Sequence, residues 1–431
     1  MKTPGGDAAP APDGALLRAV GPWGMAALVL NGIIGAGVFA LPGSVANTTG
    51  SWAPLVVAGV GLAMLPVVYV FIRLARLFDV TGGPIVYAGE AFGPTAAFQV
   101  GWLQMLAVVA AGAANINLFA DYAGRLLPGG GTSNLAHTML VLGGLALVLL
   151  ANLAQAGRLA ALLRGLTLVK LAPLLLLVLV AVPALLVQGL VARAPLQWSL
   201  PEAVLLAVYA FTGFEGALTL AGESRNPRRD LPRALLGVHI AVIILYALLT
   251  WAFVTTSFNA ATLDKAPLAT MAGVLFGSTG AVLIVLAAAL SIFANVITTV
   301  MANSRRIVAL EAQASLPVWF GAVRLPSGVP RNAVLFVSAV LVILSLSGGF
   351  VVLALLSVAA RLLVYLASIA ALPVVRRKRR LAGSGGALVV PLAAAVCIAL
   401  VAQSEPRAWA GLAVAAVIGT AVLLIGRWIR G

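Results

Sequence analysis

The sequence of 431 residues is poor in cysteine, histidine and acidic side chains, and each shortage excludes a class of chemistry. Its single cysteine, Cys397, excludes an internal disulfide. Two histidines, His137 and His239, together with that cysteine are too few for a buried zinc or iron site, so we expect no metal and no cofactor. The 12 acidic residues are scattered singly, whereas an enzyme needs several reactive groups at one place. We therefore expect a protein that is not an enzyme.

Charge is scarce overall, since 9% of the residues are charged and 62% are hydrophobic. Soluble domains contain about 25% charged residues, so the composition predicts an all-α integral membrane protein embedded in a lipid bilayer. A spanning helix needs about 20 residues, and repeated spans leave no room for a large soluble domain. The net charge of +15 would favour nucleic acid in a soluble protein, but no charged surface remains here for a phosphate-binding groove. We expect no nucleic-acid partner.

Charge-poor apolar stretches, bounded by Pro, Gly and Arg, predict 12 transmembrane helices. The predicted spans are residues 22–48, 53–72, 92–119, 135–155, 159–187, 201–222, 234–257, 278–304, 330–347, 349–372, 387–403 and 408–425. Residues 1–20 are rich in Pro and Gly and lack the basic start and apolar core of a cleavable signal. We expect them to form a disordered cytoplasmic tail.

The basic residues are distributed unevenly between the two sides of this predicted topology. Of the 27 Lys and Arg residues, two, Lys170 and Arg361, fall inside spans. The side opposite the termini receives four: Arg125, Arg193, Lys265 and Arg407. All others fall on the side of the termini, which predicts that both termini are cytoplasmic because basic loops are retained there. We interpret the run RRKRR (376–380) as part of this orientation signal, in contact with anionic lipid, rather than as a partner site.

Spans 1 and 6 contain glycines near their centres. Three glycines lie within 32–37, and Gly213 and Gly216 flank Phe214 and Glu215. Glycine disfavours helix, and irregular backbone at membrane depth is tolerated only where it lines a cavity. Interrupted helices at corresponding places in two halves of a chain indicate a transporter's central site. The alternative reading, that these glycines permit close helix packing, remains open.

Two helix breaks suit a zwitterionic ligand. The free N–H groups at the start of a second half-helix attract a carboxylate, and unwound carbonyl groups accept hydrogen bonds from an ammonium group. An α-amino acid has both groups. The sequence therefore predicts an amino acid as the small-molecule substrate.

Several motifs resemble those of the amino acid-polyamine-organocation superfamily, in its amino acid permease branch. They are GIIGAGVFALP (32–42), GGPIVYAGEAFG (82–93), AFTGFEGALTLAGESRNPRRDLPRA (210–234), NSRRIVALEAQASLPVWF (303–320) and GVPRNA (328–333). The resemblance implies two inverted five-helix repeats, residues 21–190 and 200–375, with spans 1 and 6 broken. Two peripheral helices would lie within residues 385–431. It also implies transport by alternating access.

The resemblance further implies a substrate site at the two breaks. The substrate carboxylate would meet the backbone N–H groups of Gly35, Ala36 and Gly37, and the amino group would meet carbonyl groups near Ile33, Tyr209 and Thr212. The predicted binding residues also include Phe211, Gly213 and Phe214. Many relatives have serine where this chain has Ala36, so a hydroxyl contact is lost. Tyr209 matches an aromatic residue that closes over the substrate from outside; an ordinary packed tyrosine is the alternative.

Lys170 lies too deep in span 5 for its ammonium group to reach the interface, and a lysine at this place in proton-coupled relatives replaces a bound sodium ion. We expect Lys170 to bind and release a proton, with Ser291 and Asn295 of span 8 as candidate neighbours. A fixed structural cation and a packing role are the alternatives. Glu215 is expected to gate the inner pathway or to bond Asn115 or Asn117 of span 3, unless it only stabilises a half-helix N-terminus.

These expectations describe a secondary active transporter for proton-coupled uptake of neutral amino acids. The neutral preference rests on the absence of side-chain charge at the proposed site apart from Glu215. Arg361 of span 10 has no acidic partner that can be identified from the sequence, and a buried arginine that caps carbonyl groups and a gate residue both remain open. We expect a bacterial plasma (inner) membrane protein, as a monomer or homodimer. An exchanger or exporter without net proton coupling is the alternative, and a membrane sensor that does not transport is a more remote one.

Overall fold

The computed structural model describes residues 21–78, 82–127, 133–153, 170–189, 192–218, 224, 226–259, 264–312, 316–322, 329–381 and 388–430. The predicted tail, residues 1–20, and the first part of the span predicted at 159–187 lie outside the described residues. Within these ranges every regular element is an α-helix or a short 3-10 helix. A helix satisfies its own backbone hydrogen bonds, as a lipid-embedded chain requires.

Helices occupy the described parts of all the stretches predicted to span the membrane. Apart from the two broken spans, they are α3 (Ala53–Ala63), α4 (Leu65–Leu77), α5 (Pro84–Phe92), α6 (Pro94–Gly124), α7 (Asn134–Leu153), α9 (Leu171–Gln188), α12 (Pro227–Thr256), α13 (Pro267–Ala312), α14 (Arg331–Ser347), α15 (Phe350–Lys378), α16 (Val389–Ala402) and α17 (Pro406–Arg430). Among the described residues, eight helical stretches are long and apolar enough to cross a membrane. The number of 12 spans and the inverted-repeat arrangement stay predictions.

The longest helix, α13, differs from its predicted limits. The eighth span was expected at residues 278–304, but the helix runs from Pro267 to Ala312 and changes direction at Gly277, whose φ is 71°. Glycine adopts this left-handed conformation without the steric cost that a side chain imposes. Because the helix continues past residue 304, Arg305 and Arg306 belong to a helix.

Both predicted helix breaks are present in the structure. In the first span, α1 (Pro22–Ile33) and α2 (Gly37–Thr49) are separated by residues 34–36. In the sixth, α10 (Leu200–Phe211) and the single-turn α11 (Glu215–Leu218) are separated by residues 212–214. The two breaks touch. A Cβ atom on Gly213, whose φ is 106°, would lie 2.1 Å from the Gly32 carbonyl oxygen, so only glycine permits this approach.

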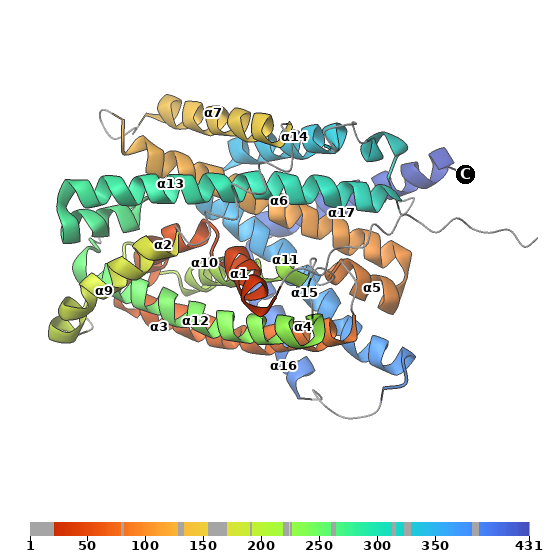
Figure 1. The fold of residues 1–431 in the computed structure, drawn as a ribbon, viewed down its shortest axis with the longest axis horizontal. Coiled ribbons are helices and arrows are strands. Elements are labelled where there is room, and N and C mark those ends of the chain that lie inside the picture. Colours follow the sequence, from red (N-terminus) through yellow and green to blue (C-terminus); the bar gives the residue numbers. More distant parts are fainter. Residues whose placement is uncertain are drawn as a thin grey trace, which may run out of the picture.

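The broken helices lie inside a bundle of longer ones. Helices α6 and α13 run side by side along the bundle, and α6 also packs against α15 (Figure 1). Helix α12 packs against α1, α3 and α4, and α10 packs against α2 and α15. The two breaks are therefore held between α6 and α13 on one side and α12 on the other.

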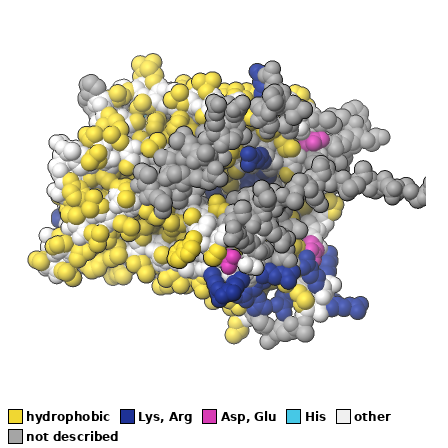
Figure 2. All heavy atoms as spheres, viewed as in Figure 1, with side chains coloured by type: hydrophobic (Ala, Val, Ile, Leu, Met, Phe, Trp, Pro, Cys, Tyr) yellow, Lys and Arg dark blue, Asp and Glu magenta, His cyan; other side chains and the backbone are white. Residues whose placement is uncertain are grey.

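The outer surface is apolar, as expected for a bundle in lipid. In α9, Leu186 is 80% exposed and Val187 is 85% exposed. Figure 2 shows hydrophobic side chains over the left part of the viewed face, whereas Lys and Arg side chains gather at its lower right. Such a polarised distribution accords with the charge asymmetry of the sequence. The side of the membrane on which these basic side chains lie stays a prediction.

Candidate functional site

A cavity of about 560 Å³ lies at the crossing of the two breaks. Its wall includes the predicted residues Ile33, Gly35, Ala36, Gly37, Tyr209, Thr212, Gly213 and Glu215. Cavities of this size are typical of small-molecule sites. The glycines shape it, because the backbone of each break faces the cavity without an intervening side chain.

The first break presents its free N–H groups at the start of α2. The Gly35 N–H, which we expected to meet a substrate carboxylate, instead donates to the Ile33 carbonyl at 2.8 Å. Ala36 is the N-cap of α2 and Gly37 its first residue, and the first N–H groups of a helix have no partner within it. The carboxylate donors available at this break are therefore those of Ala36 and Gly37, at the positive end of the helix dipole.

Two of the carbonyl groups expected to meet a substrate amino group already accept hydrogen bonds. The Ile33 carbonyl also accepts from the Tyr246 hydroxyl at 3.3 Å. The Tyr209 carbonyl accepts from the Thr212 hydroxyl at 2.7 Å and from the Thr212 N–H at 3.3 Å. These bonds stabilise the unwound backbone. Of the three carbonyl groups expected to bind a substrate amino group, that of Thr212 is therefore the most available as an acceptor.

Tyr209 connects the second break to α6 and α13. Its hydroxyl donates to Asn115 Oδ1 at 2.7 Å, and Asn115 Nδ2 donates to Asn295 Oδ1 at 2.9 Å. Asn295 also lies next to the first break, since a Cβ atom on Gly35 would be 3.2 Å from its Nδ2. These hydrogen bonds join α10 to α6 and α13, and Asn295, at their end, packs against the first break.

Lys170 immediately precedes α9 and contacts the first break. Its ammonium group donates to Asn31 Oδ1 and, at 2.6 Å, to the Ile34 carbonyl. Its side chain is buried, and its two hydrogen bonds hold the Asn31 side chain and the Ile34 carbonyl, which lie on either side of the end of α1. Ser291 is also buried, but its hydroxyl has no hydrogen-bond partner in the described part of the chain. The residue of α13 that reaches this break is Asn295.

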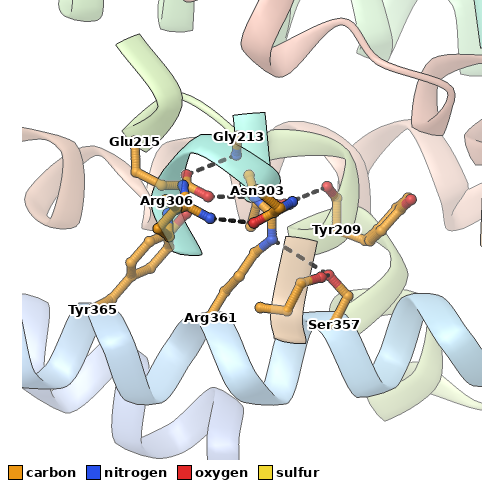
Figure 3. A network of polar contacts seen from close by, with 10 residues as sticks. Tyr209, Gly213, Glu215, Asn303, Arg306, Ser357, Arg361 and Tyr365 are labelled. Carbon is orange, nitrogen blue, oxygen red and sulfur yellow. Dashed lines mark hydrogen bonds and ion pairs between the residues drawn. The ribbon is translucent and has the colours of Figure 1, made fainter. Parts of the chain in front are cut away.

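Glu215 has a partner that the sequence did not reveal. Arg361 and Tyr365 point from α15 toward its carboxylate (Figure 3). The Arg361 guanidinium forms an ion pair with Oε1, and the Tyr365 hydroxyl donates to Oε2 at 2.7 Å. The Gly213 N–H donates to the same oxygen at 2.9 Å. Glu215 and Arg361 are 2% and 6% exposed, so this pair is buried.

The expected partners of Glu215 on α6 have other hydrogen bonds. Neither Asn115 nor Asn117 bonds Glu215; Asn117 donates to the carbonyl groups of Ala113 and Ser345.

Two of the predicted binding residues do not line the cavity. Phe211 packs against Tyr246 and His239, with ring centroids 5.4 Å and 5.5 Å away. Phe214 packs between Phe71, at 5.3 Å, and Tyr365, at 5.4 Å. These contacts direct both rings into the surrounding helices. The resemblance that suggested both residues does not fix the direction of a side chain where a helix unwinds.

The cavity lining also includes polar and charged side chains that were not expected there, among them Gln104 of α6 and Arg305 and Arg306 of α13. Gln104 carried no motif that marked it as a binding residue, and the two arginines lie beyond the predicted end of span 8. Arg361 also lines the cavity. The site is therefore more strongly charged than the sequence indicated.

A second cavity, of about 1120 Å³, lies on the other side of Tyr209. Phe350 lines this cavity and Tyr209 lines the smaller one, and their rings meet edge to face at 5.7 Å. The pair thus forms part of the wall between the two cavities. Charged groups surround the larger one, including Arg125, which pairs with Asp264 at 2.6 Å. Within the described ranges no group of three or more His, Cys, Asp or Glu side chains could hold a metal ion.

The chain matches known transporters along most of its length. The sequence model described as amino acid permease matches residues 20–423. The polyamine transporter PUT1 of Oryza sativa subsp. japonica is 29% identical over 331 residues, covering 71% of this chain and 58% of that protein. The match therefore spans less than two thirds of the rice protein.

Bacterial relatives are similar at the same level. The serine/threonine exchanger SteT of Bacillus subtilis is 27% identical over 323 residues, covering 71% of this chain and 70% of that protein. The arginine/agmatine antiporter of Chlamydia felis is 25% identical over 251 residues, covering 52% of this chain and 50% of that protein. The names of these relatives include a transporter, an exchanger and an antiporter.

Proposed function

The chain belongs to the amino acid permease family, and from this membership we propose that it is a secondary active transporter that moves amino acids by alternating access. The observation that supports this most strongly is the contact of the two helix breaks at Gly32 and Gly213, beside a cavity of about 560 Å³. Half-helices that end at a cavity offer both free N–H groups and unwound carbonyl groups to a zwitterion.

The substrate backbone is held, in this proposal, by the two breaks. Its carboxylate accepts hydrogen bonds from the N–H groups of Ala36 and Gly37, and its ammonium group donates to the Thr212 carbonyl. Tyr209 lies over the substrate and, with Phe350, separates it from the larger cavity. Movement of this pair opens the site to that side, and exclusion of water while it is closed strengthens each polar contact.

Proton coupling is assigned to Lys170 in this proposal. When protonated, its ammonium group donates to Asn31 Oδ1 and to the Ile34 carbonyl. Loss of the proton removes the charge and weakens both contacts, so the first break gains freedom to move. Binding of substrate and of a proton are linked because both act on residues 34–37. We propose uptake with protons across a bacterial inner membrane, with both termini cytoplasmic.

The experiment compares two fluxes in proteoliposomes that contain the purified full-length protein. Wild type should accumulate a labelled amino acid when the outside is made acidic, and it should also exchange internal for external substrate at equal pH. Lys170→Ala should lose the pH-driven accumulation and keep the exchange, because exchange needs no net proton flux. Full pH-driven uptake in Lys170→Ala would overturn the role of Lys170.

An exchanger without net proton coupling is the second candidate, and the names of SteT and of the Chlamydia felis antiporter favour it. In that case Lys170 is a fixed cation that stabilises the first break. Wild type would then exchange substrate at equal pH and show no accumulation under a proton gradient. The same pair of assays therefore separates the two candidates.

A further inference from the structure

We propose that the cavity contains a subsite for an anionic group, formed by Arg306, Gln104 and Arg361, and that the transported amino acid has an acidic side chain. This inference rests on the transport function proposed above and replaces the expectation of a neutral substrate. It depends on three observations: the charge of the wall, an amide without partners, and the common level of these residues in the bundle.

The charged side chains of the wall are mainly cationic. Arg305, Arg306 and Arg361 line the cavity, and Glu215 is the one acidic residue among the described residues that line it. Glu215 is already neutralised, since it accepts from Arg361, from the Tyr365 hydroxyl and from the Gly213 N–H. The other two arginines therefore leave an excess of positive charge facing the cavity.

Arg306 has a neutral partner. Its Nη1 donates to Asn303 Oδ1 at 2.5 Å, one turn earlier in the same helix. An amide oxygen satisfies one donor but does not offset the charge of a guanidinium group. Arginine presents a planar set of donors that matches a carboxylate, so an anionic ligand is the group that best completes this side chain.

Gln104 is the second observation. It is 1% exposed and it lines the cavity. Neither its Oε1 nor its Nε2 has a hydrogen-bond partner in the part of the chain that the structure describes. A buried amide left unsatisfied costs about 1–3 kcal/mol, so such groups normally have a partner. A bound ligand would supply it: Nε2 donates to a carboxylate oxygen of the substrate.

Packing contacts place Gln104 opposite Arg306. A Cβ atom on Gly101 would lie 3.2 Å from Leu310, and one on Gly112 would lie 2.9 Å from Thr299. Helices α6 and α13 are therefore antiparallel, and residue 104 of α6 faces the region of residue 306 of α13.

Helix α15 brings Arg361 to the same level. The Ser357 hydroxyl donates to the Ala107 carbonyl at 2.7 Å, and Val100 packs with Val364. Helices α6 and α15 are therefore also antiparallel. Arg361, one turn after Ser357, lies at the level of Gln104, one turn before Ala107. Arg361 and Gln104 thus occupy the same layer, and the subsite is formed by three helices.

An acidic amino acid satisfies this site at both ends. Its α-amino and α-carboxylate groups bind at the breaks, and its side-chain carboxylate accepts hydrogen bonds from Arg306 and Gln104. A lysine or arginine side chain would place a cation beside the guanidinium groups of Arg305 and Arg306, which disfavours binding. A neutral amide side chain loses the charge-assisted part of the interaction. Charge-assisted hydrogen bonds are about twice as strong as neutral ones, which corresponds to about a tenfold preference for glutamate over glutamine.

The test measures competition by L-glutamate, L-glutamine and L-lysine in the exchange assay, together with thermal stabilisation of the purified protein by each compound. Glutamate and glutamine have nearly the same shape, so their difference reports the charge alone. We expect glutamate to compete about tenfold better than glutamine and lysine not to compete. Competition by glutamine or lysine equal to that of glutamate would overturn the subsite.

Variants assign the effect to the named side chains. Arg306→Gln should remove the preference for glutamate over glutamine, and Arg306→Lys should retain part of the preference because the charge remains. Gln104→Leu should weaken glutamate binding. Arg76→Gln, which removes an exposed arginine of α4 outside the cavity, is the matched control and should keep the wild-type preference. An unchanged preference in Arg306→Gln would also contradict the proposal.

Failure of the transport function would look different. Exchange of none of the amino acids would contradict the proposed function, whereas exchange of neutral or cationic amino acids in preference to acidic ones contradicts only the subsite. Thermal stabilisation by glutamate and not by glutamine would support the subsite even in a protein that shows no flux.

Discussion

The guanidinium group of Arg361 in α15 forms a buried ion pair with the carboxylate of Glu215 at the break of the sixth span. These residues are 146 positions apart in the chain. The pair links a continuous helix to an interrupted one, so the position of the second break depends on α15. Burial of both charges is tolerated because each has further partners, Ser357 for Arg361 at 3.3 Å and Tyr365 for Glu215.

Removal of either charge alone should destabilise the protein. Glu215→Gln leaves Arg361 buried without its counter-ion, and Arg361→Gln leaves Glu215 in the same condition. Breaking a buried pair costs about 3–5 kcal/mol. We expect each single variant to unfold at a clearly lower temperature in detergent. The double variant Glu215→Gln/Arg361→Gln should lose less stability than the sum of the two, because no unpaired charge remains. Strict additivity would contradict direct coupling of the two residues.

Some features of the site could be predicted from sequence because they arise from local signals. Glycines near the centre of an apolar span predicted both helix breaks. A lysine far from the membrane interface is also unusual, and it marked Lys170 as a functional residue. The Arg361 partner could not be found in this way. Its identification requires the register of α15 relative to residues 212–218, which depends on packing between helices distant in the chain.

Gln104 and Arg306 were missed for related reasons. Gln104 gives no periodic signal in an apolar helix, and its lack of partners is a property of the packed structure. Arg306 lies beyond the predicted end of span 8. That end was placed before residues 305 and 306 because a pair of basic residues usually marks the end of a span. The resemblance suggested Phe211 and Phe214 as binding residues, but the direction of their rings depends on packing against other helices, which the sequence does not reveal.

The contact between the two breaks predicts that Gly213 cannot be replaced. A Cβ atom there would lie 2.1 Å from the Gly32 carbonyl oxygen, and the φ of 106° disfavours every other residue. We expect Gly213→Ala to lose about 3 kcal/mol or more of stability and to abolish transport, because the breaks must separate. Thermal unfolding in detergent and substrate exchange measure the two effects.

Gly216→Ala is the matched control for this variant. Gly216 lies three residues further along, in α11, and a Cβ atom there would meet nothing within 4 Å. Alanine also favours helix over glycine. We expect Gly216→Ala to be as stable as wild type or slightly more so. Equal behaviour of the two variants would mean that the breaks are not in close contact.

A second ion pair, outside the spans, predicts a pH dependence of stability. Arg379, at the end of α15, donates from Nε and Nη2 to the two carboxylate oxygens of Glu90, both at 2.6 Å. The hydrogen bond from Arg379 lowers the pKa of Glu90 below its usual value of about 4.5. A lowered pKa means that the pair stabilises the folded state above the ordinary pKa of Glu and loses this contribution as the pH falls through the lowered value.

Comparison of wild type with Glu90→Gln between pH 7 and pH 3 checks this sign. The pair is partly exposed, with 31% of the Glu90 side chain accessible, so we expect a difference of about 1 kcal/mol or less at pH 7. The difference in unfolding temperature should shrink below about pH 4. A difference that grows with acidity would contradict the assigned contact.

The wall between the two cavities predicts separate roles for the ring and the hydroxyl of Tyr209. The ring contacts Phe350 edge to face, and the hydroxyl donates to Asn115. Tyr209→Phe keeps the ring and leaves Asn115 Oδ1 without this donor, so we expect about 1–2 kcal/mol less stability and retained exchange. Tyr209→Ala removes the ring and should connect the cavities, which abolishes tight exchange and allows labelled substrate to leak down its gradient. Because the ring, and not the hydroxyl, separates the cavities, loss of exchange in Tyr209→Phe with preserved folding would instead assign the gating role to the Asn115 hydrogen bond.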